Sequence, residues 1–238
     1  MKHCIEKKDA VYALIQARMN STRLGGKILK PLLDKPIVQW VIERARKIDP
    51  HVTVAVITGK VSANAPLVDW CHRNKVLCFE GSEDDVLSRY RQAAEYFKAK
   101  TVIRLTADNP LFDYQNAYHL LVAHLTGHFD YSTSKLESGS NLPDGIGVEI
   151  FSADALMCLD SMQLSTSNRE HVNDYILSHA SEFKTCVQGM LHNYSSYRFT
   201  IDTCEDYEQL SLWLKQCEKS EFEGPHCWEQ LVKSNNIV

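Results

Sequence analysis

Three cationic side chains lie within a short segment near the start of the chain. Arg18, Arg23 and Lys27 fall in the stretch RMNSTRLGGK, in which most other residues are small and two are glycine. Small residues let backbone N–H groups approach an anion, and arginine and lysine bind phosphate through charge-assisted hydrogen bonds. The segment therefore predicts a loop that binds a triphosphate, although it lacks the GxxxxGK[ST] pattern of the Walker A loop. A solvated surface loop has the same composition, so spacing alone leaves both interpretations open.

Two aspartates each follow an apolar run of strand-like composition. Asp108 follows the run Thr101–Thr106 and precedes Pro110, and Asp202 follows residues 197–201. Two strand-terminal carboxylates at one sheet edge could share Mg²⁺, which takes one or two carboxylates together with phosphate oxygens and water. The alternative is local turn chemistry, in which Asp108 caps a turn and Asp202 precedes a helix capped by Thr203 and Asp206.

The elements that would carry these residues alternate along the chain. Helical periodicity covers residues 36–48, with Pro36 in the first turn, and a second helix around Val86 to Phe97, which a capping box from Ser82 to Asp85 would start. Such alternation predicts an α/β fold with a mostly parallel sheet and ligand sites beyond the carboxyl ends of its strands. The polar stretch 130–147 is interpreted as an active-site insertion. Strands are predicted at residues 10–16, 52–58, 76–79, 101–106, 147–151 and 197–201.

Composition and charge bound the class of protein. The 238 residues suit one domain, and 26 basic against 30 acidic residues without a basic stripe disfavour a nucleic-acid or anionic-membrane partner. An apolar leader and a membrane-spanning run are absent from the sequence, which predicts a cytoplasmic protein. The eight cysteines lack CxxC spacing and are expected to be reduced thiols.

Several ordered motifs resemble those of one family. The segment IQARMNSTRLGGKILKPLLDKPIVQWVIERARK, which begins at Ile15, is similar to the opening of cytidylyltransferases like the spore-coat polysaccharide protein SpsF, and of the wider CMP-sialate and CMP-Kdo synthetase group. The motifs EGSEDDVLSRY, RLTADNPL, LPDGIGVEIF, EHV and RFTIDTCEDYEQL follow in the order that this family uses. The resemblance covers most of residues 10–214. Gly25 departs from it, because the family usually has proline there, but no charged group of the predicted site is lost.

The resemblance implies a single-domain, Rossmann-like nucleotide-diphospho-sugar transferase fold of the GT-A type, a three-layer sandwich around a mixed, mostly parallel sheet. Residues 1–9 would form an N-terminal extension, residues 10–238 the nucleotidyltransferase domain, and residues 130–196 would include acceptor-side and dimerisation insertions. It implies catalytic roles for Arg18, Lys27 and Asp108, and Mg²⁺, or Mn²⁺ in its place, on Asp108 and Asp202. The resemblance further assigns Gln16, Ala17, Arg18, Ser21, Arg23, Lys27, Asp85, Arg89 and Asp108 to the nucleotide, and Asp144, Glu149 and His171 to the acceptor.

The predicted activity is transfer of CMP from CTP to a sugar acid or related small acceptor, with release of pyrophosphate, by a homodimer. Two alternatives remain at this point. A glycosyltransferase that uses a nucleotide sugar would keep the fold, although the DxD metal motif of such enzymes is absent. A nucleotide-binding protein without catalysis would keep the fold and the binding loop alone.

Overall fold

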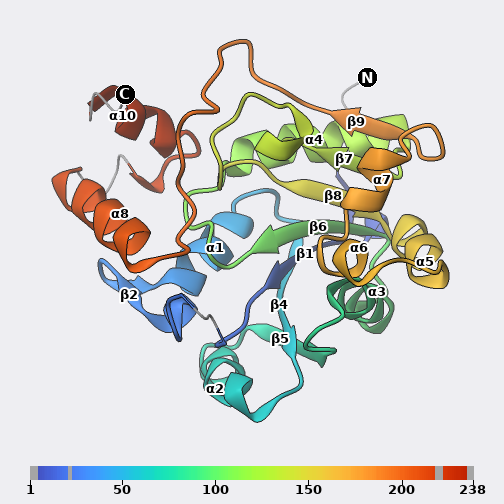
Figure 1. Ribbon diagram of the computed structural model, residues 1–238, viewed down its shortest axis with the longest axis horizontal. Coiled ribbons are helices and arrows are strands. Elements are labelled where there is room, and N and C mark those ends of the chain that lie inside the picture. The colour runs from blue at the N-terminus through green and yellow to red at the C-terminus, as the bar shows by residue number, and fades with distance from the viewer. Residues whose placement is uncertain (1–4, 21–22, 218–221, 235–238) are drawn as a thin grey trace.

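A mixed sheet forms the centre of the molecule in the computed structural model, which describes residues 5–20, 23–217 and 222–234 (Figure 1). Over these residues the seven strands follow the order β5-β4-β1-β6-β8-β7-β9. Strands β5, β4, β1 and β6 are parallel, β8 runs antiparallel to both β6 and β7, and β9 is parallel to β7. This confirms the predicted mixed, mostly parallel sheet. The strands span Val11–Gln16 (β1), Thr53–Gly59 (β4), Leu77–Gly81 (β5), Thr101–Thr106 (β6), Tyr131–Thr133 (β7), Glu149–Ser152 (β8) and Thr185–Val187 (β9).

Helices cover both faces of the sheet, so that strands such as β1 are apolar on both sides. Ala13 and Ile15 of β1 pack with α1 (Ile37–Ala45), α2 (Ala65–Arg73) and α4 (Tyr114–Gly127). Leu14 packs on the opposite face with α3 (Val86–Phe97), α5 (Ala153–Ser161) and α7 (Asp174–Ser178). The short helix α6 (Thr166–Glu170) lies against α3. The predicted three-layer sandwich is therefore confirmed.

A third apolar cluster joins the C-terminal part of the chain to this sandwich. Helices α8 (Cys204–Gln216) and α10 (Cys227–Ser234) pack with the two-stranded sheet of β2 (Pro31–Leu32) and β3 (Lys35–Pro36), around the buried side chain of Trp228. Figure 1 shows α8 beside β2 at one edge of the molecule. The short 3-10 helices are η1 (Lys7–Asp9), η2 (Lys27–Leu29), η3 (Ser62–Asn64) and η4 (Leu136–Ser138).

Two helix starts differ from the prediction by a few residues. Pro36 has an extended backbone and is the N-cap of α1, so it precedes the first turn rather than lying in it. The N-cap of α3 is Asp85, whose side chain accepts a hydrogen bond from Ser88 N at 2.9 Å. Ser82 Oγ does accept from Asp85 N at 3.1 Å, but the capping box was placed three residues too early, because Asp85 itself caps the helix.

The strand predicted at residues 197–201 was wrong. Phe199 and Ile201 are buried, which explains the apolar pattern, but the segment makes only an isolated bridge between Asp144 and Arg198. Its backbone bonds go to separate partners, since Phe199 N donates to Asp144 O and Ile201 N to Asp108 O. A buried extended segment without a neighbouring strand cannot form a ladder.

The stretch 130–147 is less turn-like than predicted, because it begins with β7, and its Tyr131 side chain is fully buried. Strand β9 was not predicted. At the other end, Ile5 of the expected N-terminal extension packs into the main core. Among the described residues, free thiols lie at Cys71, Cys78, Cys158, Cys186, Cys204 and Cys227. Within the described ranges, no helix combines the length and the apolar character needed to cross a membrane.

Candidate active site

A cavity of about 290 Å³ lies where β1 and β6 end. Gln16 is the last residue of β1, and Thr106 is the last residue of β6. Ala17 N donates to Ile57 O and Ala107 N to Gln16 O, so the backbone here is fixed between neighbouring strands. The cavity thus lies beyond the carboxyl ends of parallel strands, as predicted. Its lining residues are Gln16, Ala17, Arg18, Asn20, Arg23, Lys27, Ile28, Thr106, Ala107, Asp108 and Asp202.

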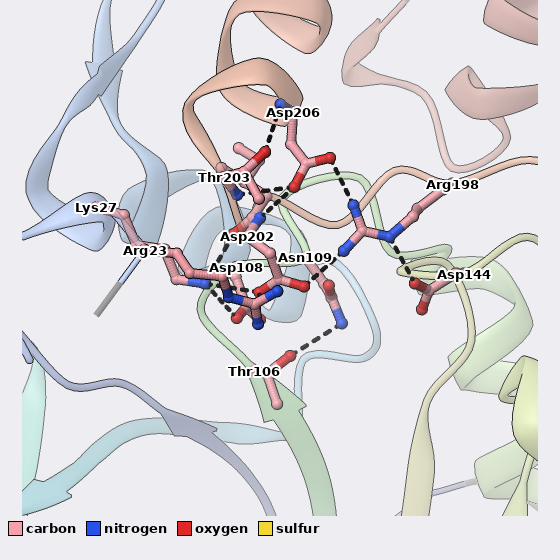
Figure 2. A network of polar contacts seen from close by, with 11 residues as sticks. Arg23, Lys27, Thr106, Asp108, Asn109, Asp144, Arg198, Asp202, Thr203 and Asp206 are labelled. Carbon is pink, nitrogen blue, oxygen red and sulfur yellow. Dashed lines mark hydrogen bonds and ion pairs between the residues drawn. The ribbon is translucent and has the colours of Figure 1, made fainter. Parts of the chain in front are cut away.

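Lys27 is the most buried cation of this cavity, with 8% of the residue exposed. Gly26 precedes it with φ 65°, a left-handed conformation that suits glycine, and Lys27 then begins η2. The ammonium lies 2.8 Å from Asp108 Oδ2, 3.1 Å from Asp202 Oδ1 and 2.7 Å from the carbonyl oxygen of Ile201 (Figure 2). One buried cation therefore joins the cationic loop to both predicted aspartates.

The two aspartates meet through backbone contacts. Ile201 N donates to Asp108 O at 2.9 Å, which places the following Asp202 beside Asp108. Asp202 N in turn donates to Asp206 Oδ2 at 2.8 Å. The predicted capping pair of Thr203 and Asp206 is confirmed, because each side chain bonds to the backbone N–H of the other at the start of α8. The helix cap thus fixes the backbone on which Asp202 sits.

Arg198 holds the outer side of Asp202 and was not assigned a role from sequence. Its guanidinium contacts Asp202 Oδ2 at 2.6 Å, Asp206 Oδ1 at 2.5 Å and Asp144 Oδ2 at 3.3 Å (Figure 2). Burial alone would raise the pKa of Asp206, but Arg198 and the capping N–H groups lower it below its ordinary value. At Asp144 the effect of burial is larger than the attraction of the Arg198 charge, so the pKa of that carboxyl is raised. Asp202 and Asp206 follow Arg198 closely in the sequence, but Asp144 lies on a distant segment, so Arg198 was recognisable only as part of a motif.

The arrangement fits a divalent cation held by two carboxylates. Asp108 and Asp202 both reach the same ammonium, so their oxygens lie within reach of one small cation. Over the described residues, no group of three or more His, Cys, Asp or Glu side chains is arranged so that it could hold a metal ion. A site with two carboxylates is the kind at which Mg²⁺ completes its shell with phosphate oxygens and water. Arg18 and Arg23, exposed at the cavity, add cationic charge, and Arg23 Nη2 lies 3.9 Å from Asp202 Oδ1.

Residues 12–229 match the family model described as cytidylyltransferase. The chain belongs to this family. It is 32% identical over 214 residues to the spore coat polysaccharide biosynthesis protein SpsF of Bacillus subtilis, with 87% of each chain covered. A solved structure of a cytidylyltransferase from Leptospira borgpetersenii is 31% identical, has a TM-score of 0.88 and matches over 95% of each chain. The protein is therefore a nucleotidyltransferase.

A more distant solved structure confirms the fold. It is that of CMP:2-keto-3-deoxy-manno-octonic acid synthetase in complex with CTP, at 15% identity and a TM-score of 0.66, over 87% of this chain and 98% of the other. At this identity the likeness concerns the nucleotidyltransferase fold alone. The fold predicted from the resemblance is thereby confirmed.

Two of the predicted nucleotide-side residues, Asp85 and Arg89, lie outside the cavity lining. Asp85 caps α3 and forms an ion pair with Arg169 at 2.7 Å. Arg89 is fully buried, and its Nη1 donates to Ser82 O at 2.6 Å, while Nε and Nη2 have no partner among the described residues. Burial lowers the pKa of Arg89. Ser21 lies outside the described residues.

The predicted acceptor-side residues are separated from one another. Glu149 is buried at the start of β8, where it pairs with Arg104 and accepts from Tyr131 Oη at 2.8 Å. Burial raises the pKa of Glu149, but Arg104 and Lys135 more than offset this and hold it below its ordinary value. A small second cavity beside Glu149 shares Thr106 with the main one.

His171, by contrast, is exposed just after α6 and lines neither cavity. Asp144, paired with Arg198, is about 40% exposed in its side chain and does not line the main cavity either. The structure therefore brings together those predicted triphosphate and metal residues that it describes, whereas it does not bring the three acceptor candidates into one group. Four further residues line the main cavity and were not predicted to do so, namely Asn20, Ile28, Thr106 and Ala107.

Proposed function

We propose that this cytidylyltransferase transfers CMP from CTP to a sugar acid or a related small acceptor, with release of pyrophosphate. The observation that carries the proposal is the convergence of Lys27, Asp108 and Asp202 in the cavity at the carboxyl ends of the strands. A cation between two carboxylates, beside two further arginines, suits a triphosphate with its metal ion. The CTP in the related synthetase complex and the name of the Bacillus subtilis relative support CTP and a role in polysaccharide or glycoconjugate biosynthesis.

The residues of the cavity would act by binding, alignment and charge. Arg18, Arg23 and Lys27 bind the triphosphate and stabilise the negative charge that develops as pyrophosphate leaves. The backbone at Gln16 and Ala17 lies near the base, and Ser21, Asp85 and Arg89 complete the nucleotide side. Mg²⁺, or Mn²⁺ in its place, would be held by Asp108 and Asp202 and would supply further charge neutralisation on the triphosphate.

The acceptor oxygen would attack the α-phosphorus in line with the departing pyrophosphate. We place the acceptor on the side of Asp144, Glu149 and His171, and we propose that the protein works as a homodimer in the cytoplasm. Asp144 fits this placement because Arg198 ties it to Asp202, at the edge of the proposed metal site.

The test is a measurement of pyrophosphate release with each nucleoside triphosphate against a panel of sugar acids, sugar phosphates, polyol phosphates and phosphonates. Mass spectrometry then identifies the product. We expect release with CTP and Mg²⁺, together with a CMP-linked product. Sugar transfer from a nucleotide sugar without pyrophosphate would contradict the proposal in favour of a glycosyltransferase, and CTP binding without turnover across the panel would indicate a binding protein.

A further inference from the structure

Asn64 joins three loops at the nucleotide side of the cavity. Its side chain is fully buried. Asn64 Oδ1 accepts from the backbone N–H of Met19 at 2.8 Å, and Nδ2 donates to Gly59 O and to Glu83 Oε2, each at 2.9 Å. Met19 directly follows Arg18 in the cationic loop, Gly59 ends β4, and Glu83 follows β5. Both amide hydrogens and the amide oxygen therefore have partners, and each partner lies on a different segment.

Asn64 lies where η3 runs into α2, as the last residue of η3 and the N-cap of α2. Its backbone is helical, with φ −88° and ψ −5°, whereas a capping asparagine usually has an extended backbone, from which its side chain accepts from the N–H groups of the helix. The Asn64 side chain makes no capping bond, and its hydrogen bonds go to other segments instead.

The surrounding residues are shaped to admit these contacts. A Cβ on Gly59 would lie 1.6 Å from Glu83 Oε2 and 2.7 Å from Glu83 Cα, so only glycine leaves room for the Glu83 carboxylate. Met19 is also held through its carbonyl, which accepts from Gly26 N at 3.0 Å. The two ends of the cationic loop, at Met19 and at Gly26 next to Lys27, are thus tied to each other, and Asn64 ties them to the sheet.

We infer that Asn64 is a positioning residue for the triphosphate loop: it holds Met19, and with it Arg18, in the arrangement that binds the nucleotide before the nucleotide arrives. The role of the loop in binding rests on the proposed function. Asn64 does not line the cavity, so its effect passes through the loop backbone. A loop that is already ordered binds its ligand more tightly, because binding then does not have to offset the conformational entropy lost on ordering the loop.

The decisive variant is Asn64→Asp, which keeps the shape but replaces the donor by a carboxylate facing Gly59 O and Glu83. We expect the KM for CTP to rise by about tenfold while kcat changes by less than about threefold, because Lys27 stays held by Asp108 and Asp202. The Kd for CTP with Mg²⁺, from calorimetry, should rise by the same factor. The matched control is Asn74→Asp at the other end of α2, where Asn74 is exposed and bonds only to Trp70 O. It should leave both constants unchanged.

Hydrogen exchange without nucleotide tests the same contact independently of the reaction. In the unsubstituted protein the Met19 amide should be protected, and it should exchange much faster in Asn64→Asp but not in Asn74→Asp. Unchanged protection, or an equal KM in Asn64→Asp and the parent, would overturn the inference. Failure of the proposed function looks different, since the parent itself would then not turn over CTP while the exchange difference persists.

A second variant covers the case in which Asn64→Asp does not fold, as judged by circular dichroism. Glu83→Ala removes one of the three contacts and leaves the asparagine in place. It should raise the KM for CTP by a smaller factor, about threefold, and increase exchange at Met19 to a lesser degree. Parent-like values of both quantities in Glu83→Ala would then count against Asn64 as the positioning residue.

Discussion

The ammonium of Lys27 lies 2.8 Å from Asp108 Oδ2, although 81 residues separate the two along the chain. The contact joins the loop after β1 to the end of β6, and Asp202 Oδ1 completes it at 3.1 Å. Removal of the cation would leave two carboxylates close together without their shared partner. Removal of either carboxylate would leave the cavity with one ligand fewer for the proposed metal ion.

Lys27→Ala should lower kcat for CTP-dependent pyrophosphate release by about a hundred- to thousandfold, the usual effect of removing one group that stabilises transition-state charge. Asp108→Asn should have an effect of similar size. The measurement is steady-state pyrophosphate release, with circular dichroism to show that the fold is retained. Lys30→Ala, a short distance along the same segment, serves as the control and should stay near the parent. Near-normal turnover in both Lys27→Ala and Asp108→Asn would rule out the proposed site.

Arg198→Gln should weaken the apparent affinity for Mg²⁺ by about ten- to a hundredfold, because residues that orient metal ligands usually contribute this much. Arg198 fixes Asp202 Oδ2 while Oδ1 faces the cavity. The measurement is the Mg²⁺ dependence of the rate at saturating CTP. Arg73→Gln, an exposed arginine on α2, is the control. An unchanged Mg²⁺ dependence in Arg198→Gln would show that Asp202 does not need this partner, or does not hold the metal.

The strands near the site could be predicted because burial on both faces leaves near-continuous apolar runs in β1, β4 and β6. The cationic loop could be predicted because its charges are close in sequence. Asp202 lies beside Asp108 as expected, but the expected reason was wrong, since the segment before Asp202 is buried and extended but is not a strand. Apolar periodicity reports burial, and it does not report whether a neighbouring strand exists.

Asn64 and Arg198 illustrate what the sequence could not reveal. Asn64 bonds to a backbone N–H 45 residues away, and nothing in the local pattern distinguishes it from an ordinary helix cap. Arg198 acts on Asp144, which lies far along the chain. Strand β9 was missed because it is three residues long and only partly buried. Such contacts depend on tertiary arrangement, which single-sequence patterns carry only indirectly.

Glu149→Gln should destabilise the fold by about 3–5 kcal/mol, because it leaves the Arg104 guanidinium buried without its counter-charge. The measurement is denaturant unfolding. The double variant, Arg104→Met with Glu149→Leu, should recover much of this loss, since well-packed apolar residues can replace a buried ion pair. The KM of this double variant for the acceptor then distinguishes the two roles of Glu149. An unchanged KM would indicate a structural role, and a raised KM would indicate that Glu149 binds the acceptor. A single Glu149→Gln variant as stable as the parent would contradict the assignment of a buried, ionised pair.

His124 should make the stability of the fold depend on pH. It is buried on α4, with Nδ1 2.9 Å from Ser132 Oγ, and burial lowers its pKa from 6.5 to about 4. Between these two values the unfolded chain binds a proton that the folded chain does not, so stability falls as the pH falls through this window. The loss should be about 2 kcal/mol at pH 5 relative to pH 7. Urea unfolding at pH 5 and at pH 7 measures this loss, and His124→Gln should show a smaller difference.

The control is His119→Gln, an exposed position on the same helix, which should keep the parent's pH dependence. Equal pH dependence in His124→Gln and the parent would assign the titration to other groups.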